Sequence, residues 1–381
     1  MTNPIPPSSG SPFGPPRTGA APAGGTQGQA LGGGAPPTAP GAPSAPSSFS
    51  APSQEQMNGR GLSPQEERTK DALMALRSEI GKAVVGQEGA VTGLIIALVA
   101  GGHALLEGVP GVAKTLLVRT MATALDVDMA RIQFTPDLMP ADITGSLVWD
   151  AGSSAFEFRR GPVFTNLLLA DEINRTPPKT QSALLEAMEE RQVSVDGQTH
   201  ALADPFMVIA TQNPVEYEGT YPLPEAQLDR FLLKLELPLP GRDAEFGIVK
   251  RHRDGFNPLA LADAGVRPVA SPADIAAARG AAARVDVSDT VLAYLVDVCR
   301  ATRESPSVRL GASPRGATAL LRTTRVWAFL QGRGFATPDD VKAMAAPTLA
   351  HRIGLRAEAD LEGLTAARVV EGVLAQVPVP R

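Results

Sequence analysis

The sequence predicts an α/β protein with a parallel five-stranded sheet, preceded by a disordered N-terminal tail and followed by a smaller all-α domain. Three observations predict this. Strand-like and helix-like apolar runs alternate as far as about Pro240, which is typical of a parallel sheet covered by helices. From Ser271 onward the patterns are helical only. The first 60 of the 381 residues hold 13 of the 35 prolines and 11 of the 37 glycines, a composition that cannot bury a core.

These shifts in composition predict four regions: a Pro/Gly/Ala-rich tail at 1–60, an α/β core at 61–240, an irregular linker at 241–270 and a helical domain at 271–381. The tail has neither a basic nor an apolar segment of the kind found in signal peptides, so we expect no secretion signal. A formal net charge of −5 argues against a basic nucleic-acid-binding coat. The single cysteine, Cys299, excludes a disulfide within the chain and suits the cytoplasm.

The first elements of the core can be predicted from capping and glycine signals. Ser63-Pro64-Gln65-Glu66 indicates a helix start, because serine caps, proline takes the first helical position and glutamate stands three residues after the cap. The apolar stretch at 91–106 is interrupted by Gly101-Gly102, so it predicts a buried helix and a strand rather than membrane insertion. Strands are expected at 103–107, 129–134, 165–170, 206–211 and 231–236, and further helices at 113–126, 178–190 and 224–230.

Two antiparallel hairpins are expected within the core. The segments 192–195 and 198–201 flank Asp196-Gly197, which is a strong hairpin turn signal. The second hairpin is expected from 146–149 with 155–159. In the C-terminal domain we expect only helices, at 272–284, 288–304, 314–331, 337–349 and 364–375.

A candidate phosphate-binding loop, Gly108-Val109-Pro110-Gly111-Val112-Ala113-Lys114-Thr115, stands between a predicted strand and a predicted helix. Its glycines allow backbone N–H groups to face phosphate oxygens, and the helix that follows points its positive end at the same place. Lys114 is expected to reach the β- and γ-phosphates, and Thr115 to offer a hydroxyl to Mg²⁺. Ala113 replaces the glycine of the general motif, and the loop can still form if this residue is right-handed helical. Taken alone, the motif could also be a Gly/Pro turn before a helix.

A second signal is an apolar run at 166–170 that ends in Asp171 and Glu172. Both acids are expected at the carboxyl edge of the sheet, where ligands bind in such folds. Asp171 is expected to hold Mg²⁺ through water and Glu172 to polarise the attacking water. Asn213 ends the next strand and is expected beside them, where it can position the water. On spacing alone, Asn213 could be a helix cap, and Arg230 and Arg315 could be surface arginines.

Together these motifs resemble the MoxR family of AAA+ ATPases, and the resemblance covers roughly residues 64–381. The matching stretches are 85–87, 108–115, 131–140, 142–145, 161–164, 171–175, 184–190, 211–214, 218–231, 313–315 and 351–352. The tail lies outside the resemblance. Alanine at position 113 is usual in this family, so this departure from the general motif puts little in doubt.

The resemblance implies a P-loop NTPase core with a lid, ATP hydrolysis with Mg²⁺, and a role for each motif. Asp171 and Glu172 look like Walker B, and Asn213 looks like sensor 1. Arg230 looks like an arginine finger that enters the neighbouring subunit's site, and Arg315 looks like sensor 2, which reaches the γ-phosphate from the lid. Thr115 and Asp171 would be the metal ligands. The residues expected around the nucleotide are Val85, Gly86, Gly108, Pro110, Gly111, Val112, Ala113, Lys114, Thr115 and Leu116.

The resemblance also implies partners. We expect a ring of identical subunits, usually a hexamer, a partner with a von Willebrand A domain, and protein clients whose complexes mature with its help. The hairpins at 192–201 and 146–159 look like the pre-sensor and helix-2 inserts. A magnesium-chelatase-like motor subunit and a nucleic-acid-remodelling motor are alternatives. No nucleic-acid partner is expected, since 192–201 contains no Lys or Arg to follow phosphates and 146–159 contains only Arg159.

Overall fold

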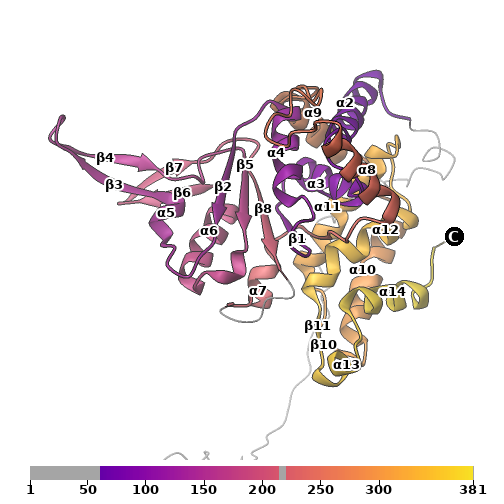
Figure 1. Cartoon of the computed structure of the whole chain (residues 1–381). Helices are drawn as coiled ribbons and strands as arrows, with labels where there is room; N and C mark the ends of the chain where they lie inside the picture. Colours follow the sequence, from indigo (N-terminus) through magenta and orange to yellow (C-terminus); the bar gives the residue numbers. More distant parts are fainter. Residues whose placement is uncertain (1–60, 214–219, 381) are drawn as a thin grey trace, which may run out of the picture. The chain divides into compact units, whose positions relative to one another are not determined.

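A computed structural model describes residues 61–213 and 220–380 of the chain (Figure 1). The predicted disordered tail at 1–60 lies outside the described residues, as does the start of the matching stretch at 218–231. Over the two described ranges, no helix is both long enough and apolar enough to cross a membrane.

Five parallel strands form the central sheet in the order β2-β5-β8-β1-β9. Both faces are buried, because Leu167 and Leu169 of β5 pack into one hydrophobic cluster while Leu168 and Ala170 pack into another. Successive side chains of a strand point to opposite faces, so a strand that is apolar at every position suits the middle of such a sheet. The strands are β1 (Ala104–Glu107), β2 (Met129–Gln133), β5 (Leu167–Asp171), β8 (Met207–Gln212) and β9 (Leu233–Glu236), each within two residues of its predicted start and end.

Helices cover the two faces of this sheet. One hydrophobic cluster takes side chains from α2 (Pro64–Gly81), α3 (Glu88–Val99) and α4 (Lys114–Leu125), and the other takes them from α6 (Pro178–Glu190). The predicted cap of α2 is confirmed: the Ser63 hydroxyl accepts from the Glu66 N–H, and the Glu66 carboxylate accepts from the Ser63 N–H at 3.0 Å. A short helix, α5 (Pro140–Thr144), packs against α6.

Both predicted hairpins are present and, in Figure 1, β3 (Gly145–Asp150) and β4 (Ala155–Arg160) project from the sheet. The second hairpin joins β6 (Gln192–Val195) to β7 (Gln198–Ala201). Its turn residues Asp196 and Gly197 have φ values of 50° and 74°, as the two-residue turn predicted from their identity requires.

The C-terminal helices are confirmed, with two corrections. The helices are α9 (Pro272–Ala283), α10 (Asp289–Glu304), α11 (Pro314–Leu330), α12 (Pro338–Leu349), α13 (Ala357–Leu361) and α14 (Ala366–Gln376). First, 241–270 is not irregular throughout, because it contains α8 (Arg242–Arg253). This helix buries no residue fully, so it lacks the apolar periodicity that predicts helices, although its acidic first turn and basic last turn favour it. Second, β10 (Val308–Leu310) pairs with β11 (Gly354–Leu355), and both strands are too short to show alternation.

Candidate functional site

The predicted phosphate-binding loop connects β1 to α4 at the carboxyl edge of the sheet. Gly108 must be glycine, because a Cβ there would lie 2.7 Å from the carbonyl oxygen of Leu237. Ala113 corrects the sequence-based expectation: it is left-handed, with φ 63° and ψ 24°, rather than right-handed helical. The chain enters α4 through this residue, which explains why the general motif prefers glycine at the position.

The ammonium group of Lys114 lies inside the loop. Its Nζ donates to the carbonyl oxygen of Gly108, and a second carbonyl oxygen, that of Gln212, lies at 3.5 Å. These two carbonyls follow β1 and end β8, which are neighbours in the sheet. Lys114 and Thr115 also form the first turn of α4, whose positive end faces the loop. The arrangement suits an anion such as a phosphate group.

The two acids end β5, as the sequence predicts, and each is held by its neighbours. Asp171 Oδ1 accepts from the Thr211 hydroxyl at 2.6 Å, and Asp171 Oδ2 is ion-paired with Arg131 Nη2 at 2.6 Å. Glu172 Oε2 accepts from Gln133 Nε2 at 2.6 Å and lies 3.2 Å from Arg175 Nε. These four partners lay within the family-like stretches, but no role was predicted for them. The pairing of β2 with β5 brings Arg131 and Gln133 to the acids, and the pairing of β5 with β8 brings Thr211, while Arg175 follows Glu172 by three residues.

Asn213 directly follows β8, the strand next to β5, and its side chain is buried. It therefore lies at the same edge as Asp171 and Lys114. The oxygen donors of Thr115 and Asp171 fit Mg²⁺, which prefers one or two protein oxygens and completes its shell with substrate phosphates and water. Among the described residues there is no group of three or more His, Cys, Asp or Glu that could hold a metal ion.

Val85 and Gly86, expected beside the adenine, form a turn before α3. Gly86 has a φ of 76°, and a Cβ there would lie 3.2 Å from the Cβ of Ala244 in α8. The next residue, Gln87, donates from Nε2 to the carbonyl of Pro238 at 3.0 Å. The helix that the sequence did not reveal therefore packs against the turn that was expected to contact the base.

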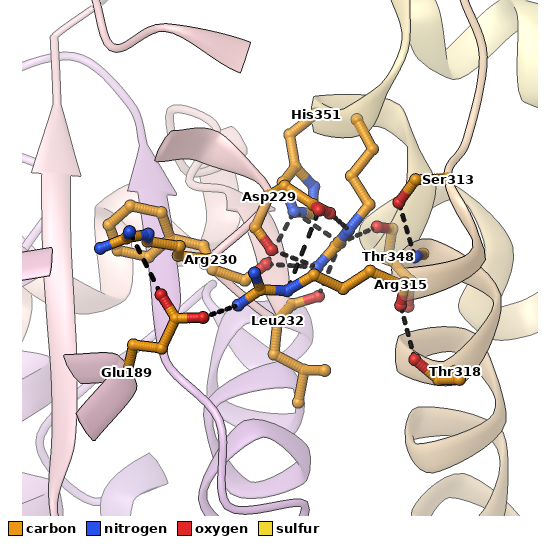
Figure 2. A network of polar contacts seen from close by, with 12 residues as sticks. Glu189, Asp229, Arg230, Leu232, Ser313, Arg315, Thr318, Thr348 and His351 are labelled. Carbon is orange, nitrogen blue, oxygen red and sulfur yellow. Dashed lines mark hydrogen bonds and ion pairs between the residues drawn. The ribbon is translucent and has the colours of Figure 1, made fainter. Parts of the chain in front are cut away.

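Arg230 and Arg315 meet on a single carboxylate, which Figure 2 shows in close-up. Glu189 Oε2 lies 3.2 Å from Arg230 Nη2, and Glu189 Oε1 lies 3.3 Å from Arg315 Nη2. Arg230 comes from the core, just after α7 (Glu225–Leu228), and Arg315 from the first turn of α11. Both side chains remain accessible, at 31% and 49% exposure. The pair could therefore bind an anion presented from outside.

The arginine pair lies at the amino edge of the sheet, opposite the phosphate-binding loop. It lines a cavity of about 240 Å³ together with Gly101, Gly102 and His103, which precede β1, and Leu232, which precedes β9. The loop that holds Lys114 follows the other end of β1. The four residues of this strand separate the cavity from the loop by roughly 13 Å, at about 3.3 Å per residue. Arg315 thus lies with Arg230 on the far side of β1 from Lys114, away from the loop whose γ-phosphate it was expected to reach within one subunit.

A buried network lies beside the pair, and Figure 2 labels two of its members, Asp229 and His351. Arg352, whose side chain is 3% exposed, donates from Nε to Asp229 Oδ1 at 2.7 Å and from Nη2 to the carbonyl of Phe231 at 2.7 Å. Burial lowers the pKa of Arg352, and burial beside Arg352 lowers the pKa of His351 well below its usual value. Glu189, Asp229 and Arg352 belonged to family-like stretches or stood beside a predicted residue, but only the fold brings them together.

His103 connects this edge to α6. Its Nδ1 accepts from the N–H of Val208 at 2.9 Å, and its Nε2 lies 3.0 Å from the carbonyl of Met188, which is the residue before Glu189. The ring is fully buried, and this burial lowers the pKa of His103 to about 4. Neutral imidazole satisfies both contacts, whereas a second ring proton would face the Val208 N–H.

Comparison with known proteins identifies the family. Residues 103–233 match the ATPase family associated with various cellular activities (AAA), and residues 300–373 match the AAA lid domain. The chain is 47% identical over 301 residues to the uncharacterized protein YeaC of Bacillus subtilis, covering 79% of this chain and 92% of the relative. It is 41% identical over 312 residues to Chaperone MoxR1 of Mycobacterium tuberculosis, covering 80% and 81%. It is 33% identical over 335 residues to Protein MoxR of Methylorubrum extorquens, covering 82% and 96%.

A solved structure agrees with these relatives. The crystal structure of a Cytophaga hutchinsonii protein classed as an ATPase superposes with a TM-score of 0.77 at 40% identity, covering 83% of this chain and 97% of the other. The fold, the lid and the similarity to MoxR proteins over most of the chain show that this protein belongs to the MoxR family of AAA+ ATPases.

Proposed function

We propose that this protein is a Mg²⁺-dependent ATPase that works as a ring, in which each nucleotide is bound by one subunit and completed by Arg230 and Arg315 of the next. The observation that carries the proposal is the separation of the two clusters by β1. A subunit cannot bring its arginine pair to its own phosphate-binding loop. In a closed ring of head-to-tail subunits, the amino edge of one sheet can face the carboxyl edge of the next subunit's sheet. The family commonly forms hexamers, which we take as the expected size.

In this scheme each residue has one role. Lys114 and the backbone N–H groups of the loop hold the phosphates, and Thr115 and Asp171 would hold Mg²⁺, which neutralises charge on the phosphate oxygens. Glu172 polarises the attacking water and Asn213 positions it. The neighbour's two guanidinium groups stabilise the negative charge that spreads over the transferred phosphoryl group, an effect of about 10³–10⁵ in rate in well-known hydrolases.

We further propose that hydrolysis drives chaperone-like remodelling of protein complexes in the cytoplasm, together with a partner that has a von Willebrand A domain. The similarity to Chaperone MoxR1 supports a chaperone-like role. Protein clients are favoured over nucleic acid, because the β6–β7 hairpin has no Lys or Arg and the tip of β3–β4 exposes Trp149 and Phe156 instead.

The test of the ATPase is Mg²⁺-dependent phosphate release by the wild-type chain, Glu172→Gln and Arg230→Ala. Both variants should lose at least about 10²-fold in turnover. If both keep the wild-type rate, the site assignment is wrong. For the client, Glu172→Gln with ATP should retain a bound protein that Lys114→Ala does not retain, and equal recovery by the two would contradict ATP-dependent binding.

A further inference from the structure

We propose that Glu189 is a positioning residue for the arginine pair, and this inference rests on the proposed function above. One carboxylate lies between two guanidinium groups that come from different parts of the chain, at 3.2 Å from Arg230 and 3.3 Å from Arg315 (Figure 2). Glu189 thus makes a core arginine and a lid arginine into one anion-binding unit. The phosphate of the neighbouring subunit's nucleotide is the anion that this unit receives.

The charge arrangement supports positioning rather than permanent neutralisation. Each guanidinium has five N–H donors, and Glu189 approaches one nitrogen of each. Arg315 Nε also lies 3.9 Å from Asp229 Oδ2, but Asp229 is ion-paired with Arg352, so the three arginines with the two carboxylates keep a net positive charge. The guanidinium donors that face neither carboxylate can contact a phosphate. Without the carboxylate, two like charges would repel each other, and the flexible side chains would separate.

The position of Glu189 on its helix is hard to explain by the stability of that helix. It stands in the last turn of α6, which holds Glu189 and Glu190 and no basic residue. Acidic side chains are unfavourable at this end, because the helix dipole places its negative pole there. The side chain is also 38% exposed, so little apolar packing depends on it. Because Glu189 does not stabilise α6, we infer that its carboxylate acts through its contacts with the two arginines.

Docking of the lid onto the core does not depend on Glu189. Buried Arg352 of the lid already bridges to the core through Asp229, the Phe231 carbonyl and the Leu232 carbonyl, at 2.7, 2.7 and 3.2 Å. A second buried contact joins His351 Nε2 to the Phe231 carbonyl at 2.9 Å. Removing the Glu189 carboxylate should therefore leave the lid in place and change only how the two accessible arginines are presented.

A subunit-mixing experiment tests the proposal with Mg²⁺-ATP. Glu189→Gln should lower the turnover of the assembled protein about 10-fold or more while keeping nucleotide binding to its own loop within about two-fold. Mixed with Lys114→Ala subunits, which keep intact arginines but lack the loop lysine, it should regain activity. Each Glu189→Gln loop then meets a wild-type arginine pair on its neighbour. Mixing Glu172→Gln with Glu189→Gln should regain activity for the same reason.

Two controls separate this inference from the proposed function. Arg230→Ala mixed with Lys114→Ala should also recover, and if it does not, the neighbouring-subunit function itself fails. Glu172→Gln mixed with Lys114→Ala should stay inactive, because neither subunit can hydrolyse at its own loop. If Arg230→Ala recovers on mixing while Glu189→Gln either keeps full activity alone or stays low in the mixture, the positioning role is wrong.

Further variants exclude a merely structural effect. Glu371→Gln removes a charge from an exposed glutamate of α14 and should keep wild-type turnover. In the Arg230→Ala, Arg315→Ala background, Glu189→Gln should cause no further loss, because its effect passes through the two arginines. An additional loss in that background, or a lowered melting temperature for Glu189→Gln alone, would overturn the proposal.

Discussion

The two edges of the central sheet carry opposite kinds of chemistry. At the carboxyl edge, side chains that directly follow β1, β5 and β8 converge within one core, and the acids there are held by Thr211, Arg131 and Gln133. At the amino edge, two accessible arginines come from the core and from the lid and share one glutamate. We propose that the first edge holds a phosphate chain and that the second offers positive charge to a neighbouring subunit.

The largest expected effect is on nucleotide binding, which should depend on Lys114 at the carboxyl edge and not on Arg230 at the amino edge. Lys114→Ala should abolish detectable binding of a fluorescent ATP analogue, because the lysine is the only loop side chain expected to reach the β- and γ-phosphates. Arg230→Ala should bind the analogue with nearly wild-type affinity at subunit concentrations too low for assembly. Titration of both variants by fluorescence anisotropy measures this. Comparable loss of affinity in dilute Arg230→Ala would mean that the two edges are not separate.

The second prediction uses dilution. Arg315→Ala should reduce turnover by about 10²–10³-fold in the assembled protein, because it removes a charge-stabilising group from the neighbour's site. Diluted to isolated subunits, Arg315→Ala and the wild-type chain should hydrolyse ATP at the same slow rate. Arg300→Ala, on the exposed side of α10, is the matched control and should behave as wild type throughout. A defect of Arg315→Ala that persists in isolated subunits would restore the expectation of action within one subunit.

The third prediction concerns pH at the amino edge. Burial in the folded chain lowers the pKa of His103 from its ordinary value of 6.5 to about 4, so between these values the unfolded chain binds a proton that the folded chain does not. Stability should therefore fall as pH drops from about 6.5 to about 4, by roughly 3 kcal/mol for this group alone. Urea denaturation at stepped pH measures it, and His103→Gln should flatten the slope. Ala277→Gly, an exposed substitution in α9 that involves no titratable side chain, gives the control and should leave the slope unchanged.

The smallest effect concerns the backbone of the carboxyl edge. Ala113→Gly should stabilise the folded chain by up to about 1 kcal/mol, because glycine has no Cβ that clashes in the left-handed conformation. The gain is limited because glycine also makes the unfolded chain more flexible, which favours unfolding. Ala277→Gly, at an exposed position inside α9, should instead destabilise by about 1 kcal/mol. Thermal unfolding of both variants decides the matter, and a destabilised Ala113→Gly would contradict the assigned strain.

The same contrast explains what could be predicted from the sequence. The features of the carboxyl edge are short and contiguous, so 108–115 and Asp171-Glu172 can be recognised in one line of text. Strand and helix positions also follow closely from apolar periodicity.

The contacts at the amino edge could not be predicted from the sequence in this way. Residues 189, 230, 315 and 352 are spread over more than 160 positions, and on spacing alone each looks like an ordinary surface charge. The family resemblance singled out Arg230 and Arg315, but not their contact with Glu189. Their meeting depends on where the lid packs, which no local pattern encodes. Helix α8 was missed for a different reason, because its side chains contribute little to a core. The position of Arg315 beside Glu189 likewise depends on the packing of the lid.

Helix α6 joins the two edges. Its first turn is bonded to the segment after the acids, through Gln181 Nε2 and the carbonyl of Ile173 at 3.2 Å, and its last turn carries Glu189. A helix of 13 residues is about 20 Å long and resists compression, so a shift at one end is delivered to the other. In the proposed ring those ends lie in two successive nucleotide sites. Helix α6 would then couple each nucleotide site to the next one in the ring, and by reciprocity each site would affect the other equally.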